Sequence, residues 1–149
     1  MVYEHLPLQA EDESLLVLKG HLLCEELLND YINQSVQSPE FLLGDDIRTH
    51  FGEKLKISQA LSHPDVADRW IWKGLRKLNM LRNAYAHSLE PNEERLKKER
   101  DKFVMHIQAN NYREFKKLGA NELGSSIISL VIAVFVVAEN ATNGHTGEI

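Results

Sequence analysis

The chain of 149 residues has one cysteine, Cys24, which excludes an internal disulfide and a zinc site built on thiolates. It has no charge-free apolar run of about 20 residues, the length that a membrane-spanning helix needs, because residues 123–138 stop short of it. Its first residues lack the basic-then-apolar order of a signal peptide, and acidic residues follow at 11–13. We therefore expect a cytoplasmic protein that does not associate with membranes.

Metal and phosphate motifs are missing as well. Seven histidines are present, yet no two stand three or four residues apart, the spacing that places two ligands on one helix face. The glycines at 119 and 124 lack the lysine and the preceding strand of a phosphate-binding loop. We expect no metal and no cofactor, and we expect Cys24, among leucines, to be a buried thiol.

Net positive charge is also lacking, since 22 acidic residues oppose 17 basic ones for a net charge of −5. The charge is polarised along the chain. Residues 1–46 hold ten acidic residues and one basic residue, whereas residues 47–117 hold sixteen basic and nine acidic residues. The acidity argues against a protein that coats DNA, but it leaves room for a local basic cleft that binds a short RNA segment.

What the sequence has is helical periodicity. Apolar residues recur at helical spacing, and these segments predict helices over 11–35, 51–62, 65–87, from Pro91 past residue 107, and over 123–138. Asp12 is placed to cap the first helix, and Pro91 to lie in the first turn of the fourth. We predict an all-α bundle of about five helices over residues 11–139, with an extension at 1–10 and a frayed tail at 140–149.

Two of these predicted helices carry a further expectation. The first helix has one leucine row at Leu15, Leu18 and Leu22 beside a second that begins at Leu16, and together they predict a broad apolar stripe. The segment 131–137 is β-branched enough to form a buried strand, but helix is preferred because no other segment offers it a strand partner.

The segment 82–87 is the most informative for function. Arg82 falls near the middle of the apolar stripe of its helix, where an unpaired charge is costly, so it must pair or line a polar pocket. The structural interpretation pairs it with Glu25 or Glu26 and makes His87 a partner of the helix dipole. Arg82 and His87 lie about 140° apart on a regular helix, so a pocket that uses both needs a distorted helix, another helix or a second subunit.

These residues, in the order Arg82-Asn83-Ala84-Tyr85-Ala86-His87, resemble the signature of the HEPN superfamily (higher eukaryote and prokaryote nucleotide-binding domains). That signature is an arginine, a polar residue, and a histidine after four to six intervening positions. The long first helix, the segment 51–57 and the segment 75–81 that leads into the motif are similar to helical HEPN proteins of bacterial defence and toxin systems. The first half is also similar to the mannitol operon repressor family, whose members are considered regulators without catalysis.

The resemblance implies a homodimer whose two motifs face each other across a cleft. Many members are metal-independent endoribonucleases, often held in check by a nucleotidyltransferase-type antitoxin. On this basis His87 would remove the proton of the RNA 2′-hydroxyl or protonate the leaving oxygen, Arg82 would hold the phosphate and stabilise its charge, and Asn83 would orient His87 or the phosphate by hydrogen bonding. Lys97, Lys98 and Arg100 are candidates for substrate binding. The alternative is a dimeric, catalytically inactive interaction or regulatory module in which the motif is structural.

Overall fold

The computed structural model describes residues 12–67, 69–86 and 92–144, and the side chains up to residue 140. Within these ranges every regular element is helical, as predicted. There are five long helices, and two of a single turn: α1 (Glu13–Ser35), α2 (Glu40–Leu43), α3 (Phe51–Leu61), α4 (Pro64–Ala67), α5 (Trp70–Ala86), α6 (Glu93–Gln108) and α7 (Glu122–Gly144). A 3-10 turn, η2 (Lys116–Leu118), precedes α7.

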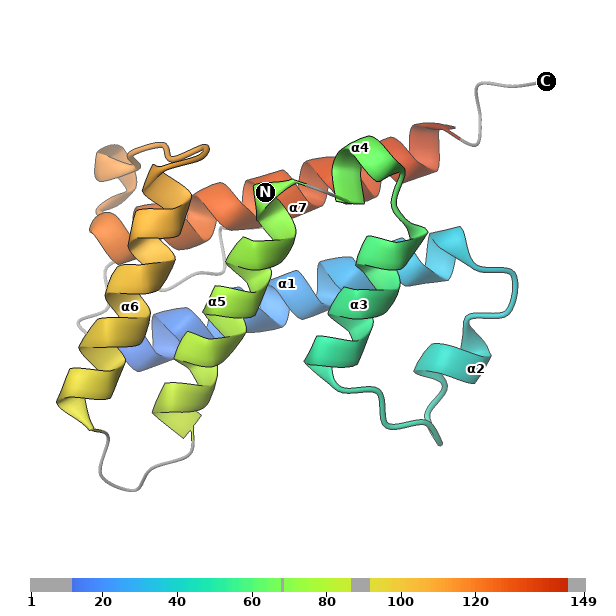
Figure 1. Ribbon diagram of the computed structural model, residues 1–149, viewed down its shortest axis with the longest axis horizontal. Helices are drawn as coiled ribbons and strands as arrows, with labels where there is room; N and C mark the ends of the chain where they lie inside the picture. Colours follow the sequence, from blue (N-terminus) through green and yellow to red (C-terminus); the bar gives the residue numbers. More distant parts are fainter. Residues whose placement is uncertain (1–11, 68, 87–91, 145–149) are drawn as a thin grey trace.

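The helices form two crossing layers (Figure 1). The helices α1 and α7 lie side by side and run in the same direction, and α3, α5 and α6 cross them steeply. The helices α5 and α6 form an antiparallel hairpin, since the start of α5 packs against the end of α6 through Trp70 and His106. One apolar core joins all five long helices, with Phe103, Leu75 and Ile127 completely buried in it.

Helix α1 begins where the sequence predicts. The side chain of Asp12 caps it, because Oδ1 accepts hydrogen bonds from the backbone N–H groups of Ser14 (3.0 Å) and Leu15 (3.4 Å). The leucine stripe, however, is narrower than predicted. The row at Leu15, Leu18 and Leu22 is 37%, 49% and 53% exposed, whereas Leu16 is buried. A helix on one side of the bundle buries only the face turned toward it, so one row stays outside.

The predicted helix over 65–87 is wrong at its start, where the chain forms α4 and begins again as α5 at Trp70. Side chains from other helices donate hydrogen bonds to the carbonyl groups of α4 at this break. The Trp72 indole N–H donates to the Val66 carbonyl and the Gln59 amide donates to the Ala67 carbonyl, each at 2.8 Å. These contacts come from elsewhere in the fold and satisfy backbone groups that a continuous helix would otherwise pair.

Two other predicted helix limits need correction. Helix α6 starts at Glu93, because the Asn92 side chain caps it by accepting from the N–H groups of Glu94 and Arg95. Pro91, which was predicted to lie in the first turn of this helix, is outside the described residues. Helix α7 continues to Gly144, beyond the predicted end at 138, since residues 125–143 contain no glycine or proline, so residues 140–144 of the predicted frayed tail are helical. The alternative strand over 131–137 is wrong, because this segment is helical.

Helix α7 is apolar along most of its length. The stretch Glu122–Asn140 has a mean hydropathy of 1.9, and it is the one described helix long and apolar enough to cross a membrane by length and composition. Within this structure 61% of its most apolar window is buried, and its inner residues pack against α1 and α6. The run therefore serves as a core helix here.

Gly20 is a point of close contact between α1 and α7. A Cβ atom at this position would lie 2.5 Å from Cγ2 of Ile127, a methyl group on the branched Cβ of a fully buried side chain. We expect Gly20→Ala to lower the free energy of unfolding by about 1–2 kcal/mol, because overpacking outweighs the helix propensity gained. Urea denaturation measures this change.

Gly52 provides the matched control for Gly20. It lies in the first turn of α3, and a Cβ atom there would meet nothing within 4 Å. Gly52→Ala is therefore expected to leave stability unchanged or to raise it by less than about 1 kcal/mol. Equal stability of the two variants would show that α1 and α7 do not meet tightly at Gly20.

Candidate functional site

The candidate site lies in the last turn of α5, where Arg82 and Asn83 project beside the N-terminal half of α1. The guanidinium Nη1 of Arg82 donates a hydrogen bond of 3.2 Å to Oδ1 of Asn83. Asn83 thereby orients Arg82, a contact that the sequence analysis did not predict, since it expected Asn83 to orient His87 or the phosphate. His87, the third motif residue, lies outside the described residues, so the structure describes two of the three predicted catalytic residues.

Arg82 is half-buried, and its Nε atom is buried without a hydrogen-bond partner among the described residues. A buried N–H group that lacks an acceptor costs about 1–3 kcal/mol, and more when it carries charge. Arg82 also lines a surface pocket of about 130 Å³ that is walled by Val17 and Leu18 of α1 and by Tyr85 of α5. Arg82 therefore lies at the wall of this pocket, and none of the ion pairs among the described residues neutralises its charge.

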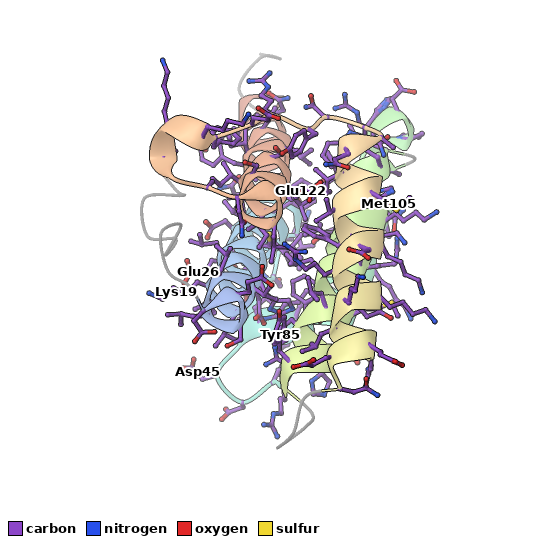
Figure 2. All side chains as sticks on the ribbon, turned by 90° about the vertical axis from the view of Figure 1, so that its left-hand side faces the viewer. Lys19, Glu26, Asp45, Tyr85, Met105 and Glu122 are labelled. Carbon is purple, nitrogen blue, oxygen red and sulfur yellow. The ribbon has the colours of Figure 1, made fainter. Side chains whose placement is uncertain are left out.

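The predicted pairing of Arg82 with Glu25 or Glu26 is wrong. Glu25 accepts a hydrogen bond of 2.8 Å from Nζ of Lys54, a residue of α3. Glu26 is exposed, and Figure 2 shows it with Lys19 on the side of α1 that faces away from α6. Neither carboxylate neutralises Arg82, so the argument that this arginine serves only helix packing loses its proposed partner.

Polar side chains from three helices contact one another near Arg82. Arg100 of α6 forms an ion pair of 3.2 Å from Nη2 to Oε1 of Glu13 in α1, and the Tyr85 hydroxyl donates to the other Glu13 oxygen at 3.4 Å. Figure 2 shows Tyr85 between α1 and α6. Burial and the Glu13 charge raise the pKa of Tyr85, so its hydroxyl keeps its proton at neutral pH.

The three basic residues predicted to bind substrate do not present one surface. Lys97 and Lys98 are exposed on α6, whereas Arg100 is half-buried and turned toward α1, where Glu13 neutralises it. The two lysines therefore remain available to an anionic partner, and Arg100 contributes to helix packing near the pocket.

His21 is a residue near the site that the sequence analysis missed. It is 6% exposed on α1, stacks on Phe51 with ring centroids 4.1 Å apart, and shares a hydrogen bond of 3.0 Å between Nε2 and Oδ1 of Asn79. Burial, with the positive charge of Arg82 adding to it, lowers the pKa of His21. Its neutral ring therefore adds no second positive charge beside Arg82.

No spacing rule could find His21. Its partner Asn79 is 58 residues away in the chain, so only the crossing of α1 and α5 brings them together. The only sequence signal was a histidine on the apolar side of a leucine-rich helix, which by itself is typical of a core residue as much as of a site.

The described residues hold no group of three or more histidine, cysteine, aspartate or glutamate side chains placed to bind a metal ion. Cys24 is completely buried, and burial raises the pKa of its thiol to about 12, which suits a packing role. The candidate chemistry of the site is thus that of a guanidinium, an amide and a phenol at the edge of a pocket.

No protein-family model, curated protein or solved structure compared with the chain matches it.

Proposed function

We propose that the protein is a metal-independent endoribonuclease of the HEPN type, acting in a toxin or defence system as a homodimer. The observation that supports this most is Arg82, which lines a surface pocket while its buried Nε has no acceptor among the residues that the structure describes. A phosphodiester oxygen is an acceptor to which such a planar, permanently charged donor group binds well.

In the proposed reaction the RNA 2′-oxygen attacks the adjacent phosphorus, and the bond from phosphorus to the 5′-oxygen breaks. His87 of one subunit acts as the base and takes the proton of the 2′-hydroxyl. His87 of the other subunit acts as the acid and gives a proton to the departing 5′-oxygen. Arg82, held by Asn83, stabilises the negative charge that builds on the phosphoryl oxygens. The products are a 2′,3′-cyclic phosphate and a 5′-hydroxyl end.

The second subunit enters the proposal through the exposed leucine row of α1. Leu15, Leu18 and Leu22 lie on one side of this helix, and Leu18 also lines the pocket of Arg82. A symmetric contact through this row would place two such pockets next to each other, as the separation of Arg82 and His87 on one helix requires.

The same leucine row favours a second candidate, a dimeric module that binds a regulatory protein and has no catalytic activity. An exposed apolar row of this kind forms an interaction surface whether or not the protein cleaves RNA at the neighbouring pocket. The two candidates differ in one measurable respect, which is cleavage of RNA.

The test is incubation of the protein with a single-stranded RNA in the presence of a chelator. We expect cleavage to 2′,3′-cyclic phosphate ends, no cleavage of the DNA of the same sequence, and loss of cleavage in His87→Ala. Cleavage of both polymers, or equal cleavage by the native protein and His87→Ala, contradicts the mechanism. No cleavage of any RNA leaves the regulatory module as the better description.

A further inference from the structure

A second pocket lies at the opposite end of α5 from Arg82. It has a volume of about 190 Å³ and lies between the start of α5, the connection from α6 to α7, and the outer side of α7. Arg69 stands thirteen residues before Arg82, which on a helical path of 1.5 Å per residue corresponds to about 20 Å. The two pockets are therefore separate, and this one is independent of the proposed nuclease chemistry.

The backbone around this pocket is held in place. The N–H group of Arg113 donates to the Ser129 hydroxyl at 3.1 Å, and that hydroxyl donates to the Ser125 carbonyl within α7 at 2.8 Å. On the other side, Nε2 of His106 lies 2.9 Å from the carbonyl oxygen of Trp70. These bonds join the connection to α7, and α6 to α5, so the pocket does not depend on a loose loop for its shape.

One side of the pocket is cationic. Arg69 precedes α5 and Arg113 follows α6, and both line the pocket. No acidic side chain lines it, and neither arginine forms an ion pair within the parts of the chain that the structure describes. Two guanidinium groups that approach from separate elements are suited to one carboxylate or phosphate group, to which each can donate two hydrogen bonds.

The other side of the pocket is apolar. Ile132, Ala133 and Val136 of α7 line it together with the half-buried Trp70 of α5. Val136 is 46% exposed, although it lies on a helix whose inner face is fully buried. A cavity of about 150 Å³ is enough for benzene, so a volume of this size accepts a ring or a branched aliphatic group beside the anion.

We propose that this pocket is a binding site for a small organic anion, in which a phosphate or carboxylate is attached to an aromatic or branched apolar group. Arg69 and Arg113 bind the charged end, and Trp70 and the side of α7 bind the apolar end. Either half alone is weak, because exposed charges are screened by salt and the apolar surface is small. A ligand that has both an anionic group and an apolar group contacts both sides of the pocket at once.

Phenyl phosphate is the probe, and the chain contains its own reporters. Trp70 lines the pocket, whereas the indole N–H of Trp72 donates to the Val66 carbonyl within the fold. In a two-dimensional NMR titration we expect a saturable shift of the Trp70 indole signal, assigned with Trp70→Phe, and a much smaller shift of the Trp72 signal. We expect the double variant Arg69→Gln/Arg113→Gln to bind at least about tenfold more weakly, the loss of at least one charge-assisted hydrogen bond.

Control measurements separate this site from nonspecific attraction. Arg95→Gln removes an exposed arginine of α6 and is expected to bind phenyl phosphate as the native protein does. Inorganic phosphate and phenol, each carrying one half of the probe, are expected to bind more weakly than phenyl phosphate. Ala133→Leu fills the apolar side and is expected to remove this advantage over inorganic phosphate.

The proposal is overturned if the Trp70 signal does not shift at phenyl phosphate concentrations on the order of 10 mM. It is also overturned if Arg95→Gln weakens binding as much as the double variant, or if inorganic phosphate binds as tightly as phenyl phosphate. None of these measurements uses RNA, so their outcome is separate from that of the nuclease assay.

Discussion

Replacing Arg82 with alanine or lysine is expected to lower the rate of RNA cleavage by about 100- to 1,000-fold, the usual cost of removing one donor that stabilises developing charge. Lysine keeps the charge but lacks the planar fork that lets Arg82 contact Asn83 and a phosphate together. The measurement is kcat/KM on a single-stranded RNA in chelator, with Arg95→Lys on the exposed side of α6 as the matched control.

The stability of these variants separates a site residue from a packing residue. Because Nε of Arg82 is buried and has no acceptor within the described part of the chain, its removal gives up no hydrogen bond recorded at that atom. We expect Arg82→Ala to unfold at nearly the same urea concentration as the native protein while it loses activity. A large loss of stability together with normal cleavage by Arg82→Lys would falsify the assignment of this residue to the site.

The second large effect is expected at the exposed leucine row of α1. Leu18→Glu and Leu22→Glu each place a charge where the proposed dimer buries an apolar side chain. Burying one leucine contributes about 1.5–3 kcal/mol, and a twofold interface contains each substitution twice, so the dimer dissociation constant is expected to rise about 100- to 10,000-fold. Sedimentation equilibrium measures this change, and cleavage is expected to fall with the dimer fraction.

Met105 provides the control for these charges. It is 67% exposed, and Figure 2 shows it on the side of α6 remote from α1. Met105→Glu is expected to leave both dimerisation and cleavage unchanged. A native protein that sediments as a monomer at all concentrations, yet cleaves RNA, would contradict the two-subunit site and leave the arrangement of Arg82 and His87 to be explained within one chain.

The local features of the fold could be predicted from sequence because their causes are local. Asp12 caps α1 through bonds to residues two and three positions later, and the helical rhythm of Ile71, Leu75 and Leu78 identifies the buried face of α5. The break before Trp70 could not be predicted in this way. It depends on Gln59 and Trp72, which reach the carbonyl groups of α4 only after the chain has folded back.

The candidate site divides in the same manner. The order Arg82-Asn83 and the resemblance it carries are properties of the chain, and they singled out the last turn of α5. The sequence left Glu25 and Glu26 as alternative partners of Arg82, whereas in the folded protein Glu25 forms an ion pair with Lys54. Charged side chains are long and several acids lie within reach in sequence, so only the crossing angles of α1, α3 and α5 choose among them.

By itself, then, the amino-acid sequence determined the helical class, the approximate limits of the long helices and the residues that could carry chemistry. These follow from periodicity, capping groups and residue type, all of which act over a few positions. Only the tertiary structure decided which leucine row of α1 stays exposed, that Arg82 has a buried donor with no acceptor among the described residues, and that Arg69 and Arg113 line one pocket. Each of these depends on how helices far apart in sequence cross, because burial and pairing are set by neighbours in space.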